Sequence, residues 1–309
     1  MDHGSPSLER HRRLVRERLA RTPRPAAGPD SVSWRINREI VVVAGWGRAI
    51  LLQFAHPLVA AGVDHHSAFR GSLLGSLKRL RSTVSAMLAL TFGDEEEVVR
   101  AAAGINSIHD RVFGQIGQAA GRFDADQRYS AHDPGLLRWV HATLLDSLPR
   151  TYELLVGPLT AEDRERYYAE AAIMEPLLDI PEGLLPRNTA QLEAYMRQML
   201  ASGEIVVTDR SRALARAVLF PPNWRLLWPF FRPVQLITIG LLPPEIRAEY
   251  GFTWDERHAR ALSRWAAALR YLHDLLPRFA REWPVARRSP ARAKSADRRL
   301  FEATHLPKA

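Results

Sequence analysis

Apolar residues recur along this chain at intervals of three and four positions, which is the spacing of one face of an α-helix. The pattern begins near Trp34, where Ile36, Ile40 and Val43 follow it, and it returns in separate stretches over most of the chain. One short run, Glu204–Thr208, has the composition of a strand instead. About ten helical segments joined by short Pro- and Gly-containing links predict an all-α fold, a single large helical domain with a pocket buried between helices.

Residue types that cap or break helices mark where several of these segments begin. The proline after His56 should end one helix, and we expect a turn carrying His65 and His66 to follow it. Gly45 and Gly47 lie inside that helix, where small residues admit either a neighbouring helix or a flat ligand. The N-terminal capping pairs that the sequence predicts are Asp94 with Glu97, Asp133 with Pro134, Thr160 with Asp163, and Thr253 with Glu256.

The two ends of the chain differ from the middle in composition. Residues 1–32 hold an Arg-rich stretch followed by T-P-R-P-A-A-G-P-D, which predicts a basic flexible segment. Residues 281–309 are again rich in Arg, Ser and Pro, and we expect a basic flexible tail. Residues 33–280 are predicted to form the all-α domain.

The composition limits the chemistry that the protein can perform. A hydrophobic fraction of 46% and a charged fraction of 25% are typical of a globular protein. The chain has no cysteine, so disulfides, iron–sulfur clusters, thiolate-ligated haem and cysteine nucleophiles are excluded, and any metal must be held by nitrogen or oxygen.

The net charge of +9 comes from the two ends of the chain. Residues 1–24 carry seven arginines and three acids, and residues 281–309 carry eight basic residues and three acids. Such tails can contact anionic surfaces, but no nucleic-acid-binding motif accompanies them, and we expect no nucleic-acid partner.

Several motif classes and targeting signals are missing from the sequence. It contains no G-x-G-x-x-G, Walker lysine loop, H-E-x-x-H or G-x-S-x-G, so Rossmann and P-loop chemistry is not indicated. The apolar run Ala49–Val63 is too short and too polar to span a bilayer, and the first residues do not resemble a secretory signal. We therefore expect a cytoplasmic protein without a transmembrane segment.

Candidate chemistry is concentrated between residues 79 and 114, in R-L-R-S-T at 79–83 and I-N-S-I-H-D-R-V-F-G at 105–114. Helical spacing puts Ile105, Ile108 and Val112 on one apolar stripe, and His109 falls on it. A neutral imidazole facing an apolar interior either hydrogen-bonds a neighbour or ligates a metal. From spacing alone, a satisfied core histidine is the commoner of these two outcomes.

Longer segments resemble a known family. They are G-W-G-R-A-I-L-L-Q-F-A-H-P-L-V-A-A-G-V-D-H-H-S at 45–67, R-L-R-S-T at 79–83, I-H-D-R-V-F-G at 108–114, Y-S-A-H-D-P-G-L-L-R-W-V-H-A-T-L at 129–144 and L-L-P-P-E-I-R-A-E-Y-G-F at 241–252. In this order they are similar to the rubber oxygenases (latex clearing proteins) and MpaB-type oxygenases, over roughly residues 33–280.

The resemblance implies an all-α domain that binds haem b. His109 would be the proximal ligand of the haem iron, and Arg79 and Thr83 would lie near the haem. Arg79 or Arg48 would pair with the haem propionates. Ser82 stands where the rubber-cleaving members have a lysine that can occupy the distal iron position, so here that position would be open or water-bound.

The function that the resemblance implies is that of a haem-dependent oxygenase. It would use dioxygen to oxidise or cleave a carbon–carbon double bond of a small apolar or isoprenoid-like substrate, with Arg79, Ser82 and Thr83 as the catalytic group. The alternative is a non-catalytic protein that binds haem or an apolar ligand. If His109 is not the ligand, the other candidates are His56, His65, His66 and His141.

Overall fold

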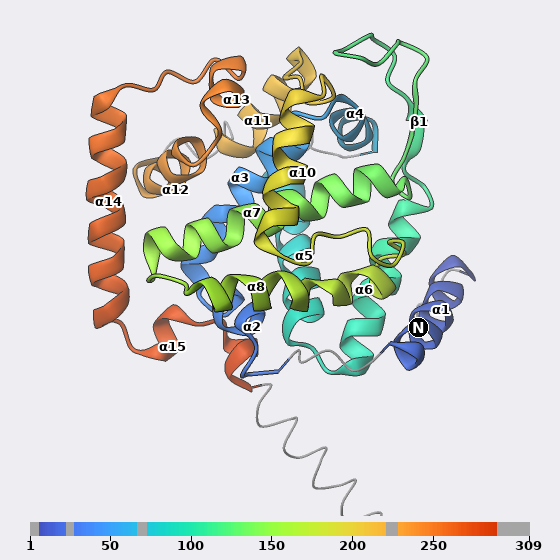
Figure 1. Ribbon diagram of the computed structural model, residues 1–309, viewed down its shortest axis with the longest axis horizontal. Helices are drawn as coiled ribbons and strands as arrows, with labels where there is room; N and C mark the ends of the chain where they lie inside the picture. The colour runs from blue at the N-terminus through green and yellow to red at the C-terminus, as the bar shows by residue number, and fades with distance from the viewer. Residues whose placement is uncertain (1–5, 23–27, 67–72, 221–227, 289–309) are drawn as a thin grey trace, which may run out of the picture.

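The computed structural model describes residues 6–22, 28–66, 73–220 and 228–288, without the side chains of residues 73–81 and 228–230. It confirms the all-α fold, because helices make up most of the described chain (Figure 1). Those in the first part are α1 (Pro6–Arg21), α2 (Val32–Asn37), the 3-10 helix η1 (Ile40–Val42), α3 (Val43–Phe54), α4 (Pro57–His66), α5 (Leu73–Phe92) and α6 (Glu95–His109).

The rest of the described chain adds further helices and one small β-hairpin. The helices are α7 (Pro134–Leu155), α8 (Ala161–Glu170), the 3-10 helix η2 (Ala171–Ile173), α9 (Met174–Leu177), α10 (Thr189–Ala201), α11 (Asp209–Leu219), α12 (Trp228–Gly240), α13 (Pro244–Glu249), α14 (Glu256–Leu275) and α15 (Arg278–Arg281). The hairpin pairs β1 (Phe113–Gln115) with β2 (Arg128–Ser130) in antiparallel register, so that Gly114 lies opposite Tyr129.

The predicted strand at residues 204–208 is wrong. This segment is extended, but the amide of Val206 donates to the carbonyl of Ala55 (2.8 Å) and the amide of Val207 to the carboxylate of Glu249 (2.8 Å). Its hydrogen bonds are thus made to a helix end and a side chain instead of a second strand.

Helices α3 and α7 cross at the centre of the molecule, where α7 runs across the middle of the view (Figure 1). Trp139 of α7 is fully buried, and its indole nitrogen donates to the carbonyl of Leu52 on α3 (3.2 Å). A Cβ at Gly45 would lie 2.6 Å from Oγ1 of Thr151, and one at Gly47 would meet the side chain of Thr238. Of the two alternatives for these glycines, the structure supports close helix packing.

A second core lies where α1 packs against α6, beside α5 and α9. Val15 of α1 and Val99 of α6 are both completely buried there. The prediction of a flexible segment over residues 1–32 is therefore wrong for α1, an amphipathic helix whose apolar side is covered. The prolines and glycine of T-P-R-P-A-A-G-P-D follow the helix and do not interrupt it; residues 23–27 of this stretch lie outside the described residues.

Most of the predicted helix starts are confirmed. Capping boxes close at Asp94 with Glu97 and at Thr160 with Asp163, and Asp133 caps α7 with a proline in its first turn. The prediction for the long helix α14 is wrong by two residues. Its N-cap is Asp255, whose carboxylate accepts from the amide of His258 (3.0 Å), so Thr253 lies before the cap.

The proline after His56 separates two helices, as predicted, but the expected turn is absent. Proline is tolerated in the first turn of a helix, so α4 begins at Pro57 and continues through His65 and His66. Among the described residues, no single helix is both long and apolar enough to cross a membrane. Only the pair Ile40–Phe54 and Pro57–His66 passes that test together, by length and composition, across a bend of 105°.

The prediction of a flexible tail from residue 281 is wrong for its first residues. Glu282 is 1% exposed, and the amide of Trp283 donates to the carbonyl of Arg38 (3.0 Å). Ala286 is also buried, against Trp34 and Phe92. The chain is thus packed at least as far as Ala286, and the remainder of the predicted tail, residues 289–309, lies outside the described residues.

Candidate functional site

His109 is the last residue of α6, and the helix ends there because the next residues form tighter turns. The amides of Arg111 and Val112 donate to the carbonyls three residues earlier, each at 3.0 Å. The predicted apolar stripe is therefore wrong. Ile108 is 54% exposed, and Val112 follows the helix and packs with the β-hairpin cluster instead.

The imidazole of His109 is half-buried and neutral. Burial lowers its pKa to about 4, and the neighbouring rings of His132 and His141 act in the same direction. Its Nδ1 is buried without a hydrogen-bond partner, and among the described residues no group bonds to its Nε2. The ring of His132 meets it edge-on, with centroids 5.7 Å apart. His109 therefore presents an unprotonated nitrogen that no described protein group uses, which is the chemistry of a metal ligand.

A polar network that the sequence did not reveal lies directly behind His109. The carboxylate of Asp110 bonds to His132 (2.9 Å) through Oδ1, and to His11 (2.9 Å) and Ser7 (2.6 Å) through Oδ2. Burial alone would raise the pKa of Asp110, but these hydrogen bonds outweigh it and hold that pKa well below its usual range. Asp110 thereby fixes α1 and the short segment before α7 to the end of α6.

His141, on α7, is the other neutral histidine near His109. Its Nδ1 lies 2.9 Å from the carbonyl of Leu137, and because a carbonyl only accepts, Nδ1 must carry the proton. Burial lowers the pKa of His141, and that hydrogen bond opposes the effect only in part. The lone pair of His141 is then on Nε2. Metal-bound histidines usually donate their other nitrogen to a carbonyl or carboxylate in this way, which His109 does not.

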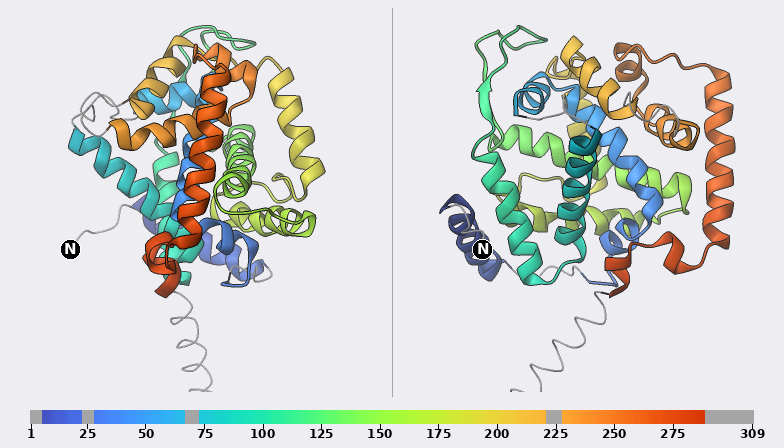
Figure 2. Two further views of the ribbon diagram at one scale, coloured as in Figure 1. Left: turned by 90° about the vertical axis from the view of Figure 1, so that its left-hand side faces the viewer. Right: turned by 180° about the vertical axis from the view of Figure 1, so that it is seen from behind.

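The R-L-R-S-T segment lies on α5, which forms a hairpin with α6 through a link of only two residues (Figure 2, right). Arg79 and His109 lie almost equally far from this link, so their backbones stand at about the same height along the paired helices. Ser82 and Thr83 are exposed. The side chain of Arg79 lies outside the described residues, so its predicted contacts with a haem stay predictions.

Arg48 is buried and all three of its side-chain nitrogens have protein partners. Nη2 pairs with Asp146 (2.6 Å), Nη1 donates to Ser147 (2.7 Å), and Nε donates to the carbonyl of Leu241 (2.6 Å). Burial would raise the pKa of Asp146, but Arg48 and Arg150 lower it. Arg48 thus joins α3 to α7 as one member of an ion pair, and its geometry gives no support to the predicted pairing with a propionate.

The remaining candidate histidines have structural contacts. His56 is 2% exposed, burial lowers its pKa to about 4, and its Nδ1 accepts from the amide of Leu58. His65 bonds to the hydroxyl of Tyr129 (2.8 Å), and His66 to the carbonyl of Phe113 (3.0 Å). These two hold the β-hairpin to α4.

The donor set fits a haem better than a multi-ligand metal site. Among the residues that the structure describes, no group of three or more His, Asp or Glu could hold a metal ion. Haem iron, in contrast, requires only one axial ligand from the protein, and a neutral histidine is a common one. His109 meets that requirement, and His141 is its rival.

The fold and this site define a helical protein with an unpaired, neutral histidine at the end of a paired helix. The family model described as "ER-bound oxygenase mpaB/B'/Rubber oxygenase, catalytic domain" matches residues 34–271, and the chain belongs to this family. The match confirms the resemblance seen in the sequence and supports an oxygenase role in general.

Two curated relatives are themselves uncharacterized proteins, one from Mycobacterium bovis and one from Mycobacterium tuberculosis. Each is 26% identical over 238 residues, which is 75% of this chain and 88% of the relative. No solved structure matches the chain.

Proposed function

We propose that the protein is a haem b-dependent oxygenase that uses dioxygen to oxidise or cleave a carbon–carbon double bond of a small apolar or isoprenoid-like substrate. Membership of the mpaB and rubber oxygenase family supports the reaction class. The observation that carries the cofactor assignment is the neutral imidazole of His109, whose pKa is lowered to about 4 and whose Nδ1 is buried without a partner.

In this proposal His109 holds the iron, and burial keeps its ring neutral so that a lone pair is available at neutral pH. Behind it, Asp110 ties His132 and α1 to the end of α6, which fixes the direction of the helix that carries the ligand. When bound, the haem would supply the activation of dioxygen.

The α5 segment would supply the polar groups of the site. Arg79 stands level with His109 on the paired helix, where its cation suits a haem propionate or a polarised oxygen. Thr83, one turn further along the same face, provides a hydroxyl that can donate or accept a hydrogen bond. Ser82 is exposed and carries no amine, so it would leave the distal side accessible.

An absorption spectrum of the purified protein, with haem added to saturation, tests the cofactor. We expect a Soret band at near-stoichiometric intensity that is lost in His109→Ala and kept in His141→Ala. The reverse pattern would assign the iron to His141, and no Soret band in either variant or the parent would remove the haem from the proposal. Circular dichroism of both variants confirms that each one folds.

Oxygen uptake with apolar olefins then tests the activity. Consumption of dioxygen together with carbonyl products from the double bond supports an oxygenase. If the haem protein binds the olefin and returns it unchanged, the protein is a binding protein instead. Ferric protein should also bind imidazole or azide readily. A spectrum that already shows two strong nitrogen ligands would mean that a side chain such as His141 closes the site.

A further inference from the structure

Helix α14 stands at the outer edge of the molecule, on the opposite side from α1, α6 and β1 (Figure 1; Figure 2, left). Its inner side packs on the body through Ala266 and His273, which are 5% and 3% exposed. Exposed apolar residues also lie outside this packed side. Of the nine large hydrophobic residues that are exposed in the described chain, five lie between residues 265 and 279.

Four of these residues form what we call the α14 stripe: Trp265, Leu272, Leu275 and Phe279, which are 44%, 48%, 63% and 67% exposed. The first three follow one another at i, i+7 and i+10, with Ala268 between them at i+3, so they share one side of the helix. Phe279 lies four residues beyond Leu275, on α15. The inner side already packs α14 on the body, so the α14 stripe is not needed for folding and is available to a partner.

Unpaired arginines lie along the α14 stripe. Arg257 and Arg264 are seven residues apart, on the side of the helix that also carries Ala268 and Leu275. Neither arginine has a carboxylate partner within the described chain. Glu256 and Asp274, the acids of this helix, lie on a different side, and Glu256 is already paired with Arg260 (3.0 Å). The stripe is therefore bordered by net positive charge.

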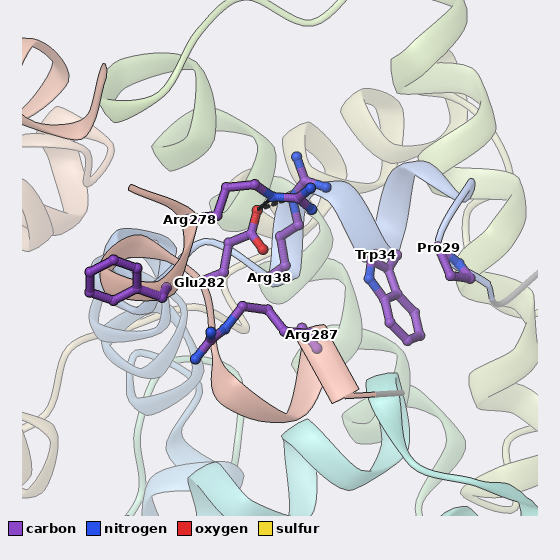
Figure 3. Close-up of a pocket in the computed structure, with 8 residues that line it drawn as sticks. Pro29, Trp34, Arg38, Arg278, Glu282 and Arg287 are labelled. Carbon is purple, nitrogen blue, oxygen red and sulfur yellow. Dashed lines mark hydrogen bonds and ion pairs between the residues drawn. The ribbon is translucent and has the colours of Figure 1, made fainter. Parts of the chain in front are cut away.

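A cationic pocket of about 500 Å³ lies at the lower end of the stripe, lined by Trp34, Arg38, Arg278, Phe279, Glu282 and Arg287, among others (Figure 3). One oxygen of the buried Glu282 is 3.4 Å from Nε of Arg38 and 2.8 Å from Nε of Arg278. The carboxylate thus holds two guanidinium groups side by side, and their terminal nitrogens have no hydrogen-bond partner among the described residues. Arg287 adds a third, exposed cation, so the pocket suits an anion such as a phosphate.

We propose that the α14 stripe and this pocket form a docking face for an anionic lipid bilayer. Trp265, Leu272, Leu275 and Phe279 insert among the lipids, while the arginines bind lipid phosphates. Trp and Phe beside Arg on one side of an exposed amphipathic helix are the combination that binds a membrane surface. The face lies away from His109, so docking leaves the candidate haem site uncovered.

Charge decides against two other occupants. A second copy of the chain would bring the same arginines together, and like charges at an interface oppose association. Residues 289–309 carry five basic residues and two acids, so the chain's own C-terminal end would also place positive charge on positive charge. An acidic protein could pair with the arginines, but its charged surface would not cover four exposed apolar side chains. Binding to vesicles distinguishes a bilayer from such a protein.

Flotation of the full-length protein with lipid vesicles tests the proposal. We expect binding to phosphatidylcholine vesicles that contain about 30% phosphatidylglycerol and little binding to pure phosphatidylcholine, with a loss of about tenfold in half-molar salt. The double variant Leu272→Gln/Leu275→Gln and the double variant Arg257→Gln/Arg264→Gln should each bind at least about tenfold more weakly. Val234→Gln is the matched control, because Val234 is 41% exposed on α12 and should leave binding unchanged.

Several outcomes would overturn the proposal. Equal binding to both kinds of vesicle, or wild-type binding by the Leu272→Gln/Leu275→Gln variant, would show that the stripe does not insert. Loss of binding only in Arg298→Gln/Arg299→Gln would assign it to the C-terminal residues. Capture of inorganic phosphate without vesicle binding would reduce the pocket to a site for free anions. A dimer in light scattering that the leucine variant abolishes, without vesicle binding, would identify a second copy as the occupant.

Discussion

Two histidines with opposite surroundings mark two regions of this molecule. His273, on α14, is 3% exposed, and its Nε2 lies 2.9 Å from the carboxylate of Glu39, the N-cap of η1, itself 2% exposed. Nη1 of Arg281 lies 3.4 Å from its Nδ1, the nitrogen that can accept a hydrogen bond. His109, at the end of α6, is half-buried, and its Nδ1 has no partner. Both rings are at least partly buried, but only His273 is satisfied by the protein.

The difference teaches how to separate a structural histidine from one that is free to bind a ligand. A protein that buries an imidazole for stability gives both nitrogens something to bond to, because an unmade buried hydrogen bond costs about 1–3 kcal/mol. His109 carries that cost unless another group takes its lone pair. The comparison therefore predicts that the same substitution at the two positions will act on different properties.

The largest effect is expected from His273→Ala. It removes one partner of a buried carboxylate, leaving Glu39 with Arg38 alone, and should lower the free energy of unfolding by roughly 3–5 kcal/mol. Urea unfolding monitored by circular dichroism measures this loss. His258→Ala is the control, because that histidine is exposed beside its N-cap partner Asp255, and its loss should cost less than about 1 kcal/mol. Similar losses in His273→Ala and His258→Ala would show that burial against Glu39 does not make His273 a stabilising residue.

His56 predicts a pH dependence of stability. In the unfolded chain it takes up a proton below about pH 6.5, whereas in the folded protein burial lowers its pKa to about 4. Between these values the unfolded state binds more protons, so stability falls as the pH falls, by about 3 kcal/mol for this one group. The difference between the unfolding free energies of the apoprotein at pH 7 and pH 4.5 should be smaller by about that amount in His56→Gln, while the part that His109 contributes remains. An unchanged slope would show that His56 is not the source.

A smaller effect is expected from Asp110→Ala, which removes the hydrogen bonds to Ser7, His11 and His132. Because this carboxylate is only partly buried, we expect a loss of about 1–2 kcal/mol. Hydrogen exchange should show faster opening of α1 in particular. Glu9→Ala, which removes an exposed ion pair with Arg12 on the same helix, should leave the exchange of α1 nearly unchanged.

The smallest effect on folding is expected from His109→Ala in the apoprotein. No hydrogen bond is lost and alanine favours a helix, so the free energy of unfolding should change by less than about 1 kcal/mol. The same variant should bind added haem at least about tenfold more weakly, equivalent to 1.4 kcal/mol or more. A large loss of stability with unchanged haem binding would make His109 a core histidine like His273.

The sequence predicted the helices well because their signals are local. Asp94, Asp133 and Thr160 cap the helices that they were expected to cap, since a cap depends only on the next three residues. The family was also recognisable from ordered segments. What the sequence could not give was the end of α6, because a turn after His109 and an apolar residue at Val112 look the same as another helical turn.

The hydrogen-bond network of Asp110 could not be predicted from the sequence for a similar physical reason. Asp110 directly follows His109, which was the one available signal, but its partners lie about a hundred residues upstream on α1 and near the start of α7. For Arg48, in contrast, the sequence indicated the need for a partner but not which partner it has. A buried arginine requires an anion, and the sequence could not tell whether Asp146 or a cofactor would supply it.

The packing of α1 on α6 also bears on where an expression fragment of this chain should begin. The family match begins at residue 34, and α1 ends well before it. A fragment started at that boundary would expose the surface of α6 that Val15 covers and would leave Asp110 without Ser7 and His11. The region matched by the family model is thus smaller than the region that packs together, and we expect a fragment that begins at residue 34 to be less stable than the full chain.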